Sequence, residues 1–247
     1  MTKWKGKTKG SLLGYKIFLY SIKLFGLGVS YFVLRFVSFY FYIFSGSNRN
    51  EMIDFYVKTL KVSRAQGIKL LKKNYYIFGQ TLIDRFAFLL GKGEEFTYSF
   101  TNESYLLEME KVGKGGFLMS GHLGNWETAG NLLKKRVTKT INVVMLDAEV
   151  QNIKAYMNEK TGGSQFNIIA IKDDFSHVIK IKNALRNNEF VAIHADRHMS
   201  GTKFIEIDFF GYPVKFPYGP FLVAYKFKVP ITFVYAVKES TRHYALS

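Results

Sequence analysis

The spacing of hydrophobic and polar residues changes twice along this chain. Residues 24–45 are almost continuously apolar, and Arg35 is the one charged residue among them. From Ile53 to about Leu90 the apolar positions recur at helical spacing, which predicts two amphipathic helices. Beyond about Phe96, short runs rich in β-branched and aromatic residues alternate with helical stretches. This last pattern predicts an α/β domain.

The predicted elements of this last region indicate a mixed central sheet flanked by helices. The strand candidates are residues 117–120, 141–146, 166–171, 190–195, 204–209 and 231–237. The helix candidates are residues 125–136, 149–159, 174–187 and 218–227. We therefore expect a basic, aromatic membrane-anchoring segment, an amphipathic helical region and an α/β domain, with the ranges 1–46, 47–95 and 96–247.

The first region contains no acidic side chain. Its seven Lys and Arg residues are interleaved with thirteen aromatic residues. Positive charge combined with large apolar rings suits an anionic membrane surface. Basic and aromatic residues also bind nucleic acids. The large aliphatic content of this segment favours lipid, and we expect no nucleic-acid partner.

Residues 24–45 are numerous enough to cross about 30 Å of hydrocarbon as one helix. Arg35 would then lie near the middle, which costs at least about 2.5 kcal/mol unless its guanidinium reaches water or a partner. A kinked or interfacial helix avoids this cost. We expect one N-terminal membrane helix, spanning or deeply embedded, with its lysines on the cytoplasmic side. No small-residue cleavage site follows it to indicate a signal peptide.

Composition excludes several kinds of chemistry. The chain has no cysteine, which rules out a thiol nucleophile, a thiolate metal site and a disulfide. It contains neither the Gly-x-Ser-x-Gly elbow of serine hydrolases nor the Gly-x4-Gly-Lys-Ser/Thr loop that binds nucleotides. His194, Asp196 and His198 would share one face of a continuing strand, but no further ligand is evident. We therefore expect no metal site.

The segment His122-Leu123-Gly124-Asn125-Trp126-Glu127 follows the predicted strand 117–120. Residues five apart in one helix lie about 140° apart around its axis, so His122 and Glu127 would not meet within a continuous helix. If the helix begins near Asn125, Glu127 falls in its first turn and its side chain can fold back to the imidazole. A histidine oriented by a carboxylate is a general base. The alternative is that both residues are ordinary helix caps.

The string Gly121-His122-Leu123-Gly124-Asn125-Trp126-Glu127 resembles the signature of the bacterial lipid A biosynthesis acyltransferases, which are related to the lysophospholipid acyltransferases. The hallmark of that superfamily is His-x4-Asp/Glu. The likeness continues in Ala195-Asp196-Arg197, Phe210-Gly211, Phe216-Pro217-Tyr218-Gly219-Pro220-Phe221 and Val229-Pro230. Upstream it includes Phe78-Gly79-Gln80 and Asp84-Arg85, so that nearly the whole chain is covered.

This resemblance implies a glycerolipid acyltransferase-like fold, with His122 and Glu127 as the catalytic pair. It implies transfer of a fatty acyl chain from acyl carrier protein, or from CoA, to a hydroxyl of a membrane lipid, with lipid A precursor as the first candidate. No cofactor is implied apart from the acyl donor as co-substrate. The implied location is the bacterial inner membrane, with the catalytic domain on the cytoplasmic side.

Six further residues are candidates for binding substrate or stabilising charge. The amides near Gly124 and Asn125, at the predicted helix start, are candidate oxyanion donors. Arg197, beside Asp196 at a strand end, is a candidate for binding phosphate, with a structural Asp–Arg pair as the alternative. The pair Gly219-Pro220 either shapes the acceptor or acyl pocket or only starts an apolar helix.

One departure from the family leaves the lipid acceptor open. Many members carry an Arg-Pro pair after the second strand, where this chain has Leu146-Asp147-Ala148-Glu149. An aminolipid or an aryl-polyene-type pigment lipid is therefore an alternative acceptor, and a non-catalytic membrane-binding protein is the alternative from another class. The chain also ends soon after the predicted strand 231–237, so we expect a shortened member or a fragment.

Overall fold

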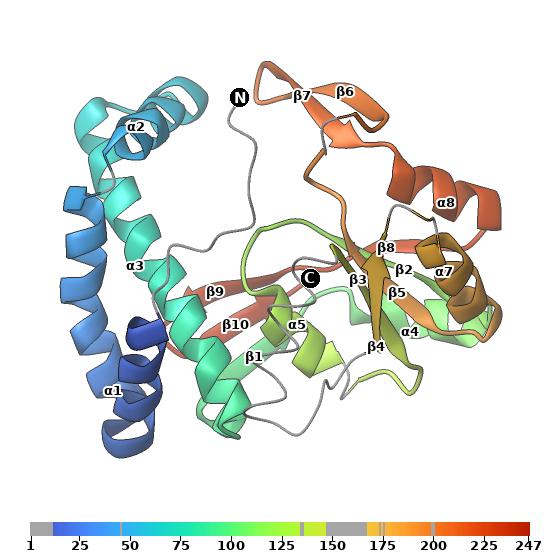
Figure 1. Ribbon diagram of the computed structural model, residues 1–247, viewed down its shortest axis with the longest axis horizontal. Coiled ribbons are helices and arrows are strands. Elements are labelled where there is room, and N and C mark those ends of the chain that lie inside the picture. The colour runs from blue at the N-terminus through green and yellow to red at the C-terminus, as the bar shows by residue number, and fades with distance from the viewer. Residues whose placement is uncertain are drawn as a thin grey trace. The chain divides into compact units, whose positions relative to one another are not determined.

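The computed structural model describes residues 12–44, 46–133, 136–146, 167–172, 174, 176–198 and 201–247. These residues form two compact units that divide between Glu95 and Phe96. The first unit is helical and the second is α/β (Figure 1). The predicted fold class, an α/β domain with an N-terminal apolar helix, is confirmed.

Helix α1 (Leu12–Phe44) is interrupted by a kink at Gly26. Gly26 has a φ of 76°, a conformation that glycine adopts without steric cost. The helix packs on α3 (Arg64–Leu89). Its buried positions recur at helical spacing and are Ile22, Leu27, Ser30, Tyr31 and Leu34. The alternative of a kinked helix, considered from the sequence, is therefore what the structure shows.

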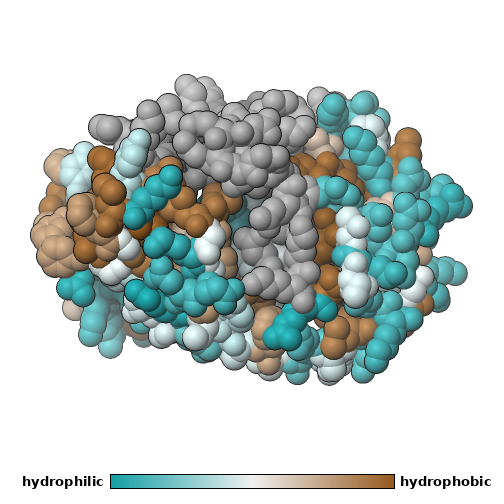
Figure 2. All heavy atoms as spheres, turned by 90° about the horizontal axis from the view of Figure 1, so that it is seen from below, coloured by the Kyte–Doolittle hydropathy of each residue, from teal (hydrophilic) through white to brown (hydrophobic). Residues whose placement is uncertain are grey.

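The opposite side of α1 is apolar and exposed. Leu24, Phe25, Phe36 and Phe44 are each more than 60% exposed, and Figure 2 shows hydrophobic residues at the surface over this helix. Residues Ile17–Phe44 are long and apolar enough to cross a membrane, by length and composition. An exposed apolar surface of this extent is typical of contact with lipid or with another protein.

Helices α2 (Ser47–Leu60) and α3 are the two helices predicted from the spacing of residues 53–90. Ser63 caps α3, since its hydroxyl accepts the Gln66 N–H while the Gln66 side chain accepts the Ser63 N–H. Within this unit the Tyr31 hydroxyl donates a hydrogen bond to the fully buried Asp84. Asp84 therefore connects α3 to α1, which gives this motif residue a structural role.

The second unit is built around a five-stranded sheet with the order β4-β3-β5-β2-β8. Its strands are β2 (Gly116–Ser120), β3 (Ile141–Leu146), β4 (Asn167–Ile171), β5 (Phe190–His194) and β8 (Ile231–Phe233). All of these strand pairs are parallel, so the central sheet, which we expected to be mixed, is parallel in the residues that the structure describes. The carboxyl ends of β2, β5 and β8 therefore meet at one edge of the sheet.

Strand β2 shows how the hydrophobic pattern builds a core on each face. Phe117 and Met119 belong to one cluster, with α7 (Ser176–Arg186) and α8 (Gly219–Phe227). Leu118 belongs to the other cluster, with α4 (Glu103–Val112) and α5 (Trp126–Leu133). All three side chains are at most 3% exposed. Burial on both faces is typical of strands in parallel sheets.

The remaining described strands form two smaller sheets. Strands β1 (Thr97–Phe100), β10 (His243–Leu246) and β9 (Ala236–Ser240) make a three-stranded sheet in which β10 and β9 are antiparallel. Strands β6 (Phe204–Phe209) and β7 (Tyr212–Pro217) pair as an antiparallel hairpin. A short 3-10 helix, Gly93–Glu95, precedes β1.

Two strand predictions need correction. The predicted strand 231–237 is divided, because β8 ends at Phe233 and β9 begins at Ala236 in a different sheet. The strand predicted at 204–209 forms, but in the hairpin and not in the central sheet. The predicted helix 149–159 and the acidic residues Asp147 and Glu149 lie outside the described residues.

Candidate active site

The site lies where two neighbouring parallel strands end. Ser120, the last residue of β2, pairs in register with His194, the last residue of β5. The Ala195 N–H donates to the Ser120 carbonyl over 2.8 Å and extends this pairing past the strand ends. His122 and Asp196 each follow two residues later, so the register of the sheet brings them together. The carboxyl ends of parallel strands are the usual place for ligand binding in such sheets.

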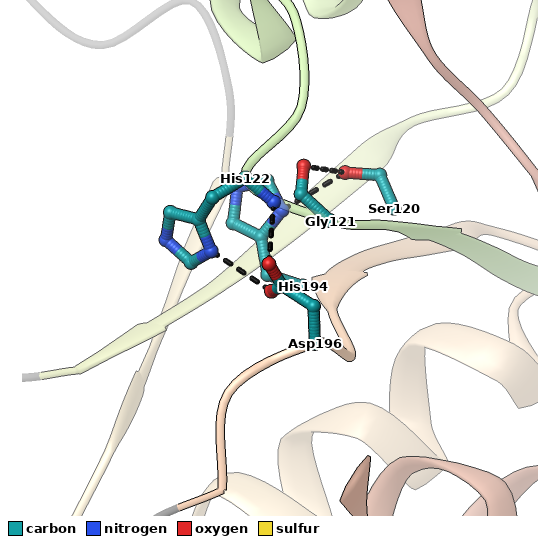
Figure 3. Close-up of polar contacts among 5 residues, drawn as sticks. All are labelled: Ser120, Gly121, His122, His194 and Asp196. Atoms are coloured by element: carbon teal, nitrogen blue, oxygen red, sulfur yellow. Dashed lines mark hydrogen bonds and ion pairs between the residues drawn. The ribbon is translucent and has the colours of Figure 1, made fainter. Parts of the chain in front are cut away.

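His122 makes two hydrogen bonds with the carboxylate of Asp196 (Figure 3). Its Nδ1 lies 2.8 Å from Oδ1, and its backbone N–H donates to Oδ2 over 2.8 Å. Gly121 permits this approach, because a Cβ at position 121 would lie 3.3 Å from Asp196 Cβ and Cγ. The carboxylate thus fixes both the backbone and the ring of His122.

The charge of Asp196 follows from its surroundings. Burial raises the pKa of this carboxyl, but the hydrogen bonds from the His122 backbone and ring outweigh burial and hold the pKa below 3.8. Asp196 is therefore a carboxylate at neutral pH and accepts the Nδ1 proton of His122. That tautomer leaves the lone pair of Nε2 free to act as a base.

His194 packs against His122, the candidate base. The sequence alone suggested His194 only as a possible metal ligand. Its ring lies 4.5 Å from that of His122 and 5.5 Å from that of Trp126, measured between centroids. Its Nδ1 is hydrogen-bonded to the Ser120 hydroxyl over 2.9 Å. Burial, followed by the charges of His122 and Arg197, lowers the pKa of His194 to about 4 against the opposing effect of Asp196. His194 is therefore neutral at pH 7.

Glu127 lies in the first turn of α5, which begins at Trp126, so the predicted helix start is confirmed. We expected Glu127 to orient the imidazole. The structure places Asp196 at Nδ1 of His122, and that orienting position belongs to Asp196. Glu127 lines an apolar cavity beside the site. Its catalytic role remains a prediction.

This cavity has a volume of about 90 Å³ and lies between β2, β3, β5 and α5. Most of its lining is aliphatic, including Leu118, Leu133, Ile141, Val143 and Ala192. The polar residues of the lining are Ser120, Glu127 and His194. An apolar cavity that carries a few polar groups and adjoins a histidine base suits a ligand with a hydrocarbon part.

Asn125 has a structural role that differs from the oxyanion role we expected. Its backbone N–H donates to the Ala236 carbonyl over 2.8 Å. Its side-chain oxygen accepts the Thr128 N–H at the start of α5, and its side-chain amide donates to the Tyr244 hydroxyl. These bonds commit both amides of Asn125 to other partners. The neighbouring Gly124 amide remains the candidate oxyanion donor.

The other predicted site residues lie in different settings. Asp196 is hydrogen-bonded to His122, where we expected a substrate contact or a pair with Arg197. Arg197 is exposed and follows Asp196 in the loop after β5. Gly219 and Pro220 begin α8, whose Ala224 joins the core, and neither of them lines the cavity. Their helix-start role is established, and their effect on a substrate remains a prediction.

The alternating residues His194, Asp196 and His198 have other partners. His198 Nε2 lies 3.2 Å from the Thr202 carbonyl, while the other two side chains bond to Ser120 and His122. Among the residues that the structure describes, no group of three His, Cys, Asp or Glu side chains is arranged to hold a metal ion.

A histidine held by a carboxylate, at the carboxyl ends of parallel strands and beside an apolar cavity, is an arrangement that can supply a general base to a ligand with a hydrocarbon part. Comparison with known proteins shows the family of the chain. Residues 61–247 match the family model of bacterial lipid A biosynthesis acyltransferases, and the chain belongs to that family.

Two curated relatives match a shorter part of the chain. Both are phosphatidylinositol mannoside acyltransferases of Mycobacterium tuberculosis, from strains H37Rv and CDC 1551, and each is 28% identical over 110 residues. The match covers 44% of this chain and 34% of each relative. The chain thus spans about a third of the length of these relatives.

Proposed function

We propose that this protein transfers a fatty acyl group from a thioester donor to a hydroxyl of a membrane lipid, with His122 as the general base. The observation that carries this proposal is the bidentate contact between His122 and Asp196. The family match and the apolar cavity beside the pair support it. Direct transfer needs no covalent enzyme intermediate, in keeping with a chain that has no cysteine.

Each group at the site has a defined task in this mechanism. Asp196 accepts the Nδ1 proton, and Nε2 of His122 takes the proton of the acceptor hydroxyl as its oxygen attacks the thioester carbonyl. The new C–O bond forms, the C–S bond breaks, and the leaving thiolate takes the proton back from the imidazolium. Asp196 stabilises the transient imidazolium. General-base catalysis of this type contributes a factor of roughly 100 to 10,000.

The remaining rate enhancement requires positioning and charge stabilisation. We assign the Gly124 amide to the carbonyl oxygen of the thioester, because the Asn125 amides are committed elsewhere. Glu127, on the wall of the cavity, is the second carboxylate of the site. Arg197 is exposed at the same end of the sheet and suits a phosphate of the donor or of the acceptor.

For the acceptor, we propose a hydroxyl of a membrane glycolipid, with a lipid A precursor as the first candidate. Lipid A and phosphatidylinositol mannosides are both phosphate-bearing glycolipids, so the family and the two relatives agree in this chemistry. An aminolipid or a pigment lipid of the aryl-polyene type remains the alternative. The donor is acyl carrier protein or CoA, without a further cofactor. The net charge of +16 favours an acidic carrier protein.

We place the protein at the bacterial inner membrane, with α1 as the anchor and the α/β unit on the cytoplasmic side. The apolar exposed side of α1 supports the anchor. The cytoplasmic orientation rests on the lysine-rich N-terminal sequence, because basic segments are retained on that side.

The test measures release of the donor thiol with a thiol reagent, and the absence of cysteine removes the background from the protein. His122→Ala should abolish transfer and thiol release. The matched control is His243→Ala, since His243 lies in β10 and bonds to Thr97 and Ser99. Equal activity of His122→Ala and the parent protein would exclude the proposed base.

A second substitution tests the role of the carboxylate. Asp196→Asn keeps the shape of the side chain but removes the charge that fixes the tautomer of His122, so kcat should fall by about 100-fold or more. Asp54→Asn, at an exposed residue that pairs with Arg64, is the control.

Lipid mass spectrometry of cells with and without the gene identifies the acceptor, and an unchanged lipid A profile would exclude the first candidate.

A further inference from the structure

The β6–β7 hairpin has one face that carries only apolar side chains. The register pairs Ile205 with Phe216, Ile207 with Val214 and Phe209 with Tyr212. Because successive strand residues point to opposite faces, these six side chains share one face of the ribbon. Figure 1 shows the hairpin as a ribbon separate from the five-stranded sheet. This apolar face therefore consists of Ile205, Ile207, Phe209, Tyr212, Val214 and Phe216.

Most of this apolar face is exposed, while Val214 and Phe216 are half-buried. Every residue of β6 is exposed, and the exposed fractions are 47% for Ile207, 50% for Phe209 and 43% for Tyr212. Soluble proteins rarely leave a continuous apolar face in contact with water, and such faces mark interaction sites. An isolated two-stranded ribbon also has little stability by itself, so a surface that covers one face would stabilise it.

The charged side chains of the hairpin lie on the opposite face. Glu206 pairs across the strands with Lys215, whose ammonium lies 4.3 Å from the ring centroid of Phe204. Asp208 accepts the Gly211 N–H over 2.9 Å and thereby holds the turn. Glu206, Asp208 and Lys215 therefore lie on the same face, and the ribbon has one charged side and one uncharged side.

The turn carries an aromatic residue in an unusual conformation. Phe210 and Gly211 have φ values of 57° and 81°, which define a turn that favours Asn-Gly. A bulky residue with positive φ is rare, and such strained positions point to a function. The Phe210 ring is 58% exposed and lies 4.7 Å from that of Phe209. The tip therefore presents two aromatic rings to the surroundings, although one of them disfavours the turn.

We propose that the apolar face and aromatic tip of the β6–β7 hairpin insert into the interfacial layer of an anionic lipid bilayer and dock the α/β unit on the membrane. Aromatic rings concentrate at that layer, where apolar groups are buried by several ångströms. The net charge of +16 complements anionic lipid, and Lys203 stands at the base of the hairpin. Helix α1, with its apolar exposed side, would tether the chain to the same bilayer.

This docking would serve the α/β unit that contains His122 and Asp196. The hairpin follows Asp196 within the same unit, and the His198 ring contacts the Phe204 ring at 5.0 Å between centroids. Docking would thus hold the site near the bilayer surface, where a lipid acceptor lies. The hairpin contact itself does not depend on the chemistry at His122, so the two proposals can fail separately.

The absence of cysteine makes a direct test possible in the full chain. Single cysteines at Ile207, Phe209 and Phe210 are labelled with an environment-sensitive dye, and matched labels are placed at Glu206 and Lys215 on the charged face. The protein is reconstituted in phosphatidylglycerol–phosphatidylcholine vesicles with and without lipids that carry a nitroxide quencher in the acyl chain. Phe36→Cys in α1 and Glu239→Cys in β9 are the membrane and water references.

If the hairpin inserts, the lipid quencher should reduce the fluorescence of dyes at Ile207, Phe209 and Phe210. Dyes at Glu206 and Lys215 should not be quenched, so that quenching alternates between the two faces of the strands. Absence of lipid quenching on the apolar face would overturn the proposal. A shielded dye without lipid quenching would overturn it as well, because a second copy or another protein segment would then cover the face.

Phe210→Asn separates docking from folding. Asparagine suits the positive φ at this position, so the hairpin should keep its structure while the dye at Ile207 loses lipid quenching. Unchanged quenching in this variant would show that the aromatic tip does not contribute, contrary to the proposal. Neither experiment requires catalytic activity.

Discussion

Gly124 lies where the protein has no room for a side chain. A Cβ at this position would lie 2.1 Å from the Ala236 carbonyl oxygen and 2.8 Å from its carbon. Favourable non-bonded contacts need about 3.5 Å, so Gly124→Ala would force a displacement of roughly 1 Å. The φ of 74° at Gly124 adds about 1 kcal/mol for an L-residue.

The displacement would fall on the loop that carries His122. Ala236 is fully buried in β9, and its carbonyl accepts the Asn125 N–H over 2.8 Å at the start of α5. The strand therefore cannot move away easily, and the loop from His122 to Asn125 must shift. A misplacement of about 1 Å in a catalytic group typically costs about 100-fold in rate. We expect kcat to fall by about this factor while the protein stays folded.

Gly28→Ala, in α1, is the matched control for this substitution. A Cβ at Gly28 meets no atom within 4 Å, and Gly28 has no positive φ. Thiol release from the acyl donor measures activity, and circular dichroism verifies that both variants are folded. Parental activity in Gly124→Ala, or an equal loss in Gly28→Ala, would refute the reasoning from the close contact with Ala236.

Two further predictions concern the half-buried His194 and the cavity. Because the pKa of His194 is about 4 in the folded protein and 6.5 in the reference state, the unfolded chain binds more protons between these values. Stability should therefore fall by up to about 3 kcal/mol as the pH decreases from 6.5 to 4. Urea unfolding at several pH values measures this change, and a His194→Gln variant with the same pH dependence would contradict it. Ala192→Leu, on the cavity wall, should shift the preference toward shorter acyl donors. A competition assay with donors of two chain lengths measures this preference, and an unchanged ratio would remove the cavity from the acyl path.

Local sequence patterns predicted the regular elements of the central sheet well. The runs that became β2, β3 and β5 are short, mostly apolar and at least half-buried on both faces, so composition alone marks them. Helix α5 was predicted because its start is marked by polar residues and its apolar positions have helical spacing. Such elements depend on neighbours within a few residues, which the sequence displays directly.

Other elements left no clear local pattern. Strand β7 contains Pro213 and Pro217, which are typical of turns, and it forms because it pairs with β6. The edge strand β1 is short and half exposed, and its partner β10 lies at the far end of the chain. The change of sheet between Phe233 and Ala236 was also missed, since a continuous apolar run gives no sign of where it leaves one sheet for another.

The candidate site also combines features that the sequence predicts with features that only the tertiary structure shows. The sequence by itself indicated His122 as the candidate base, the helix that begins after it and the family to which the chain belongs. Only the tertiary structure decided that the carboxylate at Nδ1 of His122 comes from Asp196, 74 residues away, and that neutral His194 packs on the His122 ring. The physical reason is the strand register, which aligns the ends of β2 and β5. Spacing along one segment describes a helix turn, but contacts between separate strands depend on how the whole sheet pairs.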